Sequence, residues 1–235
     1  ITEINDIPLN QFDSNLRGLD LIKIKGSVLN NDGTINSSYN GELTATVYDK
    51  NIQRATLGND QTTDNNGNII ILDYQTQGEV LFRGNASVSN GNYEFEFIMP
   101  KDLRNNIGPG KFSFYSKDQN FELDNNGYNL GILMGGINEN AEIDNTGPEI
   151  DLFMNDESFT NGGITNENPN LIVKLFDLNG INTSGGIGHD IVATIDNDNA
   201  NSFVLNDYYT AETDNYKNGT VNFPLNNLTP GPHTL

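Results

Sequence analysis

Alternation of apolar and polar residues is the dominant pattern along this chain. In the segment 92–97, Asn-Tyr-Glu-Phe-Glu-Phe, the aromatic side chains fall on odd positions and the carboxylates on even positions. A period of two places Phe95 and Phe97 on one face of a β-strand, and we expect that face to be buried. Asn90-Gly91 precedes this strand and tolerates positive φ angles, which predicts a tight hairpin with a strand at 80–89.

The same alternation recurs along the rest of the chain, and no stretch shows a convincing period of 3.6 residues. Helices are therefore expected to be short or absent. The alternating apolar positions are Ile22 and Ile24; Leu43, Ala45 and Val47; Phe112 and Phe114; Ile150, Leu152 and Met154; Val173 and Leu175; Ile191, Ala193 and Ile195; and Val221, Phe223 and Leu225. Those that we expect to be mostly buried are Phe95, Phe97, Phe112 and Phe114 in the first half, and Ile191, Ala193, Ile195 and Phe223 in the second.

Turn-forming residues divide these strands into two series. Strands separated by loops rich in Gly, Asn and Asp favour antiparallel sandwiches, because βαβ units need amphipathic helices between their strands. The segment 144–148, Asp-Asn-Thr-Gly-Pro, indicates a boundary between the series. We predict an all-β chain with two antiparallel immunoglobulin-like β-sandwich domains in tandem, at 1–145 and 146–235. The final residues before Leu235 read as the start of a strand, so we expect the second domain to be truncated at its C-terminus.

One segment of the first predicted domain, 51–68, has few apolar residues and is rich in Asn, Asp, Thr and Gly. Such a composition buries too little apolar surface to offset the entropy of ordering. We therefore predict a mobile insertion loop around 51–68.

Charge and composition exclude several classes of function. The chain has 32 acidic against 12 basic residues and a net charge of −20, which repels nucleic acid. No stretch approaches the roughly 18 consecutive apolar residues of a membrane-spanning helix, so we expect no direct membrane span. The chain has no Cys, which removes disulfides, cysteine-rich zinc sites and thiol nucleophiles.

Acidic and amide side chains in turns point to calcium as the one candidate cofactor. Ca²⁺ prefers oxygen ligands, and the candidate residues are Asp144 and Asn145, Asp177 and Asn179, and the turn 64–68. None of these reaches the full EF-hand pattern. Asn-Gly and Asp-Asn turns also arise from backbone needs alone.

Candidate catalytic groups are few, and a structural role is favoured for each. His189 beside Asp190 has the residue types of a general-base pair, but adjacent residues on a strand point to opposite faces. A histidine that bonds a backbone carbonyl is the favoured alternative, for His233 as well. Glu94 and Glu96 share one face of a strand, where an ordinary solvated surface is favoured over a glycosidase pair. We therefore predict no catalytic residue in this chain.

Several runs, taken together and in order, resemble one known family. They are Ile1–Asn5, the segment 81–101 with its Phe-Arg-Gly and Met-Pro-Lys, the run Gly-Gly-Ile-Gly-His-Asp-Ile-Val-Ala at 185–193, Val-Leu-Asn-Asp-Tyr-Tyr at 204–209, and Leu-Thr-Pro-Gly-Pro-His-Thr-Leu at 228–235. They resemble the region downstream of the peptidase domain in PorU-type sortases of the type IX secretion system, which are gingipain-like cysteine peptidases. In this resemblance Ile1–Asn5 corresponds to the linker that leaves the peptidase domain.

The resemblance implies a larger cell-surface parent, associated with the outer membrane. Such a parent is a cysteine endopeptidase and transpeptidase that removes sorting domains from exported proteins and attaches them to lipopolysaccharide. Its reactive Cys and His lie in the preceding domain, so no catalytic residue carries over to this chain. The implied partners are the parent's own peptidase domain, a PorV-type outer-membrane barrel, and PorQ- and PorZ-like proteins. This chain would be a non-catalytic scaffold and docking segment.

Two other function classes stay open from the sequence. A β-sandwich module of a surface adhesin or carbohydrate-binding array should show repeats and an aromatic platform, but Trp is absent and the two halves share no clear repeat. A free-standing hydrolase would need a cleft with perturbed titratable groups. The scaffold is the leading hypothesis.

Overall fold

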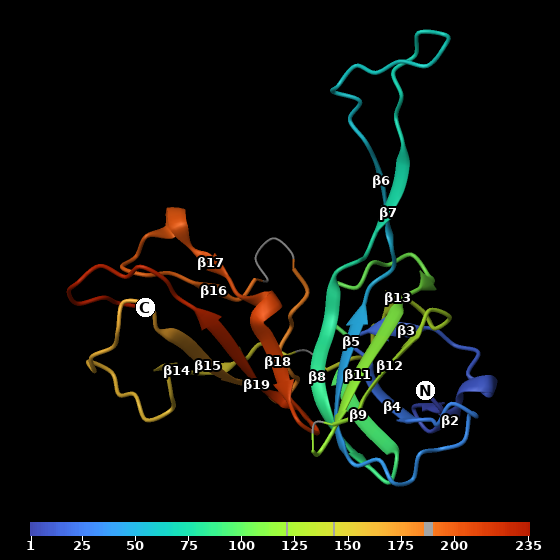
Figure 1. Cartoon of the computed structure of the whole chain (residues 1–235), viewed down its shortest axis with the longest axis horizontal. Coiled ribbons are helices and arrows are strands. Elements are labelled where there is room, and N and C mark those ends of the chain that lie inside the picture. The colour runs from blue at the N-terminus through green and yellow to red at the C-terminus, as the bar shows by residue number, and fades with distance from the viewer. Residues whose placement is uncertain (121, 143, 186–189) are drawn as a thin grey trace.

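The chain folds almost entirely into β-strands, as a computed structural model of residues 1–120, 122–142, 144–185 and 190–235 shows (Figure 1). Helix in these ranges is limited to the short 3-10 turns η1 (Leu9–Gln11), η2 (Asn199–Asn201) and η3 (Asn206–Tyr208). No helix among the described residues is long and apolar enough to cross a membrane. The prediction of an all-β chain is confirmed. The strands form two lobes, and a narrow arm projects from the first lobe (Figure 1).

The first lobe is a sandwich made from one folded sheet. One layer contains β12 (Asp124–Asn129), β11 (Lys111–Asp118), β5 (Gly41–Tyr48) and β8 (Val80–Ser89), and the other contains β9 (Asn92–Ile98), β4 (Leu21–Ser27), β1 (Glu3–Ile4) and β2 (Ile7–Pro8). Strands β8 and β9 pair only beside their hairpin, so the sheet folds over there. A small sheet of β10 (Gly108–Pro109), β13 (Leu133–Ile137) and β3 (Leu16–Gly18) completes the lobe.

Aromatic side chains fill the space between the two layers. The rings of Phe82 and Phe97 stack with centroids 4.6 Å apart, and Phe95 meets Phe114 edge-on at 6.4 Å. Aromatic pairs in these geometries add to the stabilisation that burial itself supplies. Phe95, Phe97, Phe112 and Phe114 are all buried, which confirms the register predicted from the alternation.

The predicted hairpin between β8 and β9 is confirmed in its details. Asn90 has a φ of 51° and Gly91 a φ of 74°. Two consecutive positive φ angles are the requirement of a type I′ turn, which matches the twist of the strands that it joins. The Gly91 amide also donates to the carbonyl of Tyr39 at 2.8 Å, which ties the turn to the neighbouring loop.

The second lobe contains one antiparallel sheet and two very short strands. The sheet runs β14 (Glu149–Met154), β15 (Asn170–Phe176), β19 (Asn215–Pro224) and β18 (Tyr209–Glu212), and β16 (Val192–Ala193) pairs with β17 (Phe203–Val204). Ala193 is buried as predicted, but Ile191, Ile195 and Phe223 are only half-buried. The physical reason is that β16 and β17 are two residues long and cover little of the sheet.

Strand β14 forms where the alternation predicted it, but its apolar side chains are not buried. Ile150 is 59% exposed and Leu152 is 44% exposed. In the described chain β14 pairs along its length only with β15 and ends the sheet, so its side chains have neighbours on one side. Alternation thus predicted the strand correctly but did not predict the environment of its apolar face.

Two parallel pairings depart from the predicted antiparallel arrangement. Strand β13 runs parallel to β3 inside the first lobe, and β18 runs parallel to β8 through the single pair Ala211 and Gly84. The second pairing links the lobes, because β8 belongs to the first and β18 to the second. The division of the chain into domains at 145 and 146 stays a prediction.

Candidate functional site

The arm is the most prominent feature of the first lobe (Figure 1, cyan). Its base is the two-stranded ribbon of β6 (Ile52–Ala55) and β7 (Asp73–Thr76), which lies between β5 and β8 along the chain. The insertion predicted at 51–68 is therefore longer and more regular than an irregular loop. Composition singled out only part of it, since the strand that pairs with β6 lies beyond residue 68. The mobility of the segment stays a prediction.

Apolar side chains are exposed along the arm. Leu57 is 86% exposed, and the others are Ile69, Ile70, Ile71, Leu72 and Tyr74. Single exposed apolar residues are normal, but a contiguous group of them marks a contact surface more often than chance. The arm is accordingly a candidate interaction element.

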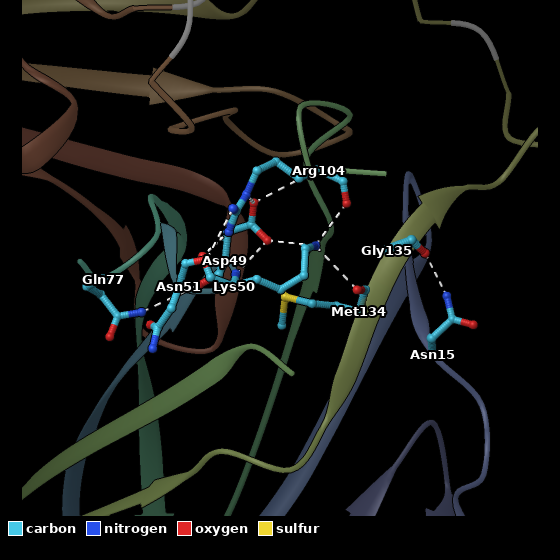
Figure 2. Close-up of polar contacts among 8 residues, drawn as sticks. All are labelled: Asn15, Asp49, Lys50, Asn51, Gln77, Arg104, Met134 and Gly135. Carbon is cyan, nitrogen blue, oxygen red and sulfur yellow. Dashed lines mark hydrogen bonds and ion pairs between the residues drawn. The ribbon is translucent and has the colours of Figure 1, made fainter. Parts of the chain in front are cut away.

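Three charged side chains meet where the arm joins the lobe (Figure 2). Asp49 and Lys50, both 4% exposed, follow β5 directly, and Arg104 comes from the loop between β9 and β10. The Asp49 carboxylate accepts from the Arg104 Nε at 2.7 Å and lies 2.8 Å from the Lys50 Nζ. Lys50 Nζ also donates to the carbonyl oxygens of Arg104 at 2.8 Å and Met134 at 3.3 Å. We call Asp49, Lys50 and Arg104 the base cluster.

Opposing effects act on the carboxyl group of the base cluster. Burial raises the pKa of Asp49, whereas hydrogen bonds from Arg104 and Lys50 lower it, and the net direction is downward. The carboxylate is therefore ionised at neutral pH. A buried ion pair is stable only when its remaining hydrogen-bonding capacity is also used, as it is here.

The lobes meet through polar contacts as well as through the pairing of β18 with β8. Asp214, just after β18, accepts from the backbone amide of Ser87 at 2.8 Å and donates its own amide to the carbonyl of Asn85 at 3.0 Å. In the loop after β9, the Asp102 carboxylate accepts from the side-chain amide of Asn182 at 2.7 Å. Contacts at these separate points restrict rotation of one lobe against the other.

A hollow of about 170 Å³ also lies at the junction of the lobes. Its walls include Leu81, Phe82 and Phe97 from the first lobe, and Ile181 and Tyr209 from the second. The lining is therefore mostly apolar. A space of this size accommodates a few water molecules.

The structure links the calcium candidates through hydrogen bonds of Asp144 and Asn179. Asn179 Nδ2 donates to the Asp144 carboxylate at 2.8 Å, and Asp177 accepts from the backbone amide of Asn179 at 2.8 Å. Hydrogen bonds from the Thr146 backbone amide, the Asn179 side chain and the Asn145 backbone amide lower the pKa of Asp144. Among the described residues no group of three or more acidic, His or Cys side chains has a metal-binding arrangement. Calcium at Asp144, Asn145, Asp177 and Asn179 stays a prediction.

The other calcium candidate, the turn 64–68, is an internally bonded turn. Asp64 Oδ1 accepts from the backbone amides of Asn66 at 2.8 Å and Asn68 at 2.9 Å. This is the local hydrogen bonding by which Asp stabilises turns. The structure therefore supplies a backbone role for this carboxylate.

His233 and Glu94 have contacts that fit structural roles. His233 Nδ1 lies 2.7 Å from an Asp196 carboxylate oxygen, and its Nε2 lies 2.7 Å from the carbonyl oxygen of Thr229. The carbonyl of Thr229, and then Asp196, raise the pKa of His233. Glu94 faces the ammonium groups of Lys23 and Lys25 on β4. His189 lies outside the described residues.

Comparison with known proteins gives an informative similarity. The chain matches no family model and no curated protein. A crystal structure of dimeric latent PorU from Porphyromonas gingivalis is similar over 99% of this chain, with 29% identity and a TM-score of 0.57. The match covers 21% of that PorU chain, so this chain spans about a fifth of its length. Nearly the whole chain is thus similar, in sequence and in fold, to one region of PorU.

Proposed function

We propose that this chain is the non-catalytic β-sandwich scaffold and docking segment of a PorU-type cell-surface sortase. The observation that carries the proposal is the similarity to PorU, which extends over 99% of this chain but only 21% of that protein. The chain has no Cys, so a cysteine peptidase that contains it would draw its nucleophile from another part of the polypeptide.

The junction between the lobes supports a scaffold role. A spacer that sets the position of an attached domain has to resist bending between its parts. Here the backbone pair Ala211 and Gly84, the contacts of Asp214 and the Asn182–Asp102 hydrogen bond hold the lobes at separate points. In the parent, such a unit would keep the peptidase domain at a fixed distance from a membrane-held partner such as a PorV-type barrel.

The arm is the surface that we propose for protein contacts within this function. The arm projects away from both lobes (Figure 1). Its apolar side chains are exposed, and exposed apolar surface of this kind gains most from burial against a partner. The PorU structure is described as dimeric, and a second copy of the parent is the partner that we propose for this chain.

The scaffold proposal is tested in cells that produce the full parent protein. Phe223 lies between the rings of Phe203, at 5.2 Å, and Tyr208, at 4.7 Å, so Phe223→Asp places a charge inside this aromatic group. We expect cells with this variant to accumulate cargo that retains its sorting domain, although the catalytic Cys is untouched. The exposed Tyr128, changed to Asp, is the control and should leave processing normal.

Two results would count against the proposal. Normal cargo processing by a Phe223→Asp parent whose second lobe is shown to be unfolded would make the segment dispensable. A parent gene without a gingipain-like domain carrying Cys and His would remove the sortase assignment and favour a surface adhesin instead.

A further inference from the structure

The arm leaves the first lobe through a joint that has little backbone pairing of its own. Regular pairing of β5 with β8 ends at Tyr48 and Val80, and pairing of β6 with β7 begins at Ile52 and Thr76. Between these ladders a single backbone hydrogen bond, from the Asp49 amide to the Glu79 carbonyl at 2.8 Å, bridges the two sides in the described contacts. A two-stranded ribbon is marginally stable by itself, so a joint of this kind would pivot unless side chains fixed it.

Arg104 holds the outgoing side of this joint. Its guanidinium donates to the carbonyl oxygens of Lys50 and of Asn51, the last residue before β6, while its Nε binds Asp49 (Figure 2). The planar fork of Arg suits such simultaneous contacts, and a single ammonium does not reproduce them. One side chain from the body of the lobe therefore hydrogen-bonds three consecutive residues of the joint.

Lys50 fixes the same strand from a second direction. Its ammonium reaches the carbonyl oxygens of Arg104 and of Met134 on β13, both of which belong to the body of the lobe. With the 2.8 Å contact to Asp49, all three ammonium protons have acceptors. An alternative direction of the strand would leave this buried charge without partners, which is costly.

The return side is held by close packing. A Cβ atom on Gly78 would lie 2.3 Å from the Lys50 carbonyl oxygen and 2.4 Å from that of Asp49, so only glycine permits this approach. Gln77 also directs its side-chain amide toward the Asp49 carbonyl at 3.4 Å. Both strands of the arm are thus fixed against the same buried group of atoms.

We propose that Asp49, Lys50 and Arg104 form a rigid joint that sets the direction in which the arm leaves the sandwich. The arm is then presented in one orientation before it meets any partner, which lowers the entropy lost on association. The joint would thereby set the orientation of the contact surface named under the proposed function. Its biological use rests on that function, whereas the fixed direction of the arm does not.

A distance measurement between the arm and the lobe tests the joint directly. The chain has no Cys, so spin labels are introduced at Gln53→Cys on the paired ribbon of the arm and Tyr128→Cys on β12, both at exposed positions. Double electron–electron resonance gives the distribution of distances between the labels. We expect one narrow distribution in the labelled chain, and a broader or displaced one after Arg104→Gln. The matched control is Arg54→Gln on β6, an exposed position, which should leave the distribution unchanged.

Circular dichroism establishes that each variant is folded. If Arg104→Gln unfolds the lobe, Arg104→Lys is measured instead. It keeps the positive charge but lacks the planar guanidinium that reaches the carbonyl oxygens of both Lys50 and Asn51. We expect the same broadening from it. The proposal would be wrong if the distance distribution stayed narrow and unchanged in the folded Arg104 variant, or if it were already broad in the labelled chain without that substitution. These results do not depend on whether the arm binds a second protein, so the joint and the proposed function fail separately.

Discussion

Removal of the Asp49 carboxylate should be among the most destabilising single changes in the first lobe. Asp49→Ala leaves the Lys50 ammonium, whose side chain is 5% exposed, without the anion that lies 2.8 Å from it. Breaking a buried pair from one side costs about 3–5 kcal/mol, because the remaining charge stays desolvated. The Arg104 side chain is 35% exposed and water screens part of its loss, so we expect a value near the lower end, about 3 kcal/mol.

Urea unfolding followed by circular dichroism measures this cost. With a slope of about 1–3 kcal/mol per molar urea, the midpoint should fall by about 1–3 M. Asp49→Ala combined with Lys50→Met should recover part of the loss, since it also removes the uncompensated ammonium. Asp60→Ala on the exposed arm is the control and should barely move the midpoint. An Asp49→Ala midpoint equal to that of the unchanged chain would refute the energetic role assigned to the base cluster.

The same carboxylate predicts how the difference depends on pH. The pKa of Asp49 in the folded chain lies below the value of about 3.9 in an unfolded chain. A group with a depressed pKa contributes stability that is fully present above its unfolded pKa and lost as the pH falls through its folded pKa. The stability difference between the unchanged chain and Asp49→Ala should therefore be constant from neutral pH to about pH 5 and shrink under more acidic conditions.

Three further changes test other parts of the structure. Phe97→Ala should cost about 3–5 kcal/mol in chemical unfolding, because it empties a fully buried site, whereas Tyr128→Ala on the surface should cost little. Nuclear magnetic resonance should show His233 titrating with a midpoint above about pH 6.5. The stability that protonated His233 contributes should be complete below that pH and lost as the pH rises through its raised pKa. A titration midpoint below about pH 6.5 would contradict the contacts with Thr229 and Asp196. Gly78→Ala should lower the unfolding midpoint, and an unchanged midpoint would show that the joint tolerates a Cβ atom.

The sequence predicted strands well where one face of the strand is buried. At Phe95 and Phe97 the alternation of aromatic and acidic residues identified both the strand and its inward face, since burial of one face imposes a period of two. At Ile150 and Leu152 the same alternation identified the strand but not its exposed apolar face. Whether an apolar face is covered depends on other strands, and the local pattern carries no information about them.

The base cluster could not have been found from the sequence. Asp49 and Lys50 are separated by more than fifty positions from Arg104, and no motif relates them. Charged residues beside a strand are ordinarily solvated, so burial of Lys50 is the less expected outcome. The extent of the arm was missed for a related reason: composition identifies a polar segment, but the strand that pairs with β6 is recognised only when the chain is folded.

The link between the lobes has a mechanical consequence. Along β5 and β8, or β15 and β19, many backbone hydrogen bonds share a load applied parallel to the strands. Between the lobes the corresponding load falls on the single residue pair Ala211 and Gly84, the backbone hydrogen bond from Asp214 to Asn85, and a few side-chain contacts. Tension applied across the two lobes should therefore separate them at this junction before either lobe unfolds, and a force-extension trace would show a small early rupture followed by larger ones.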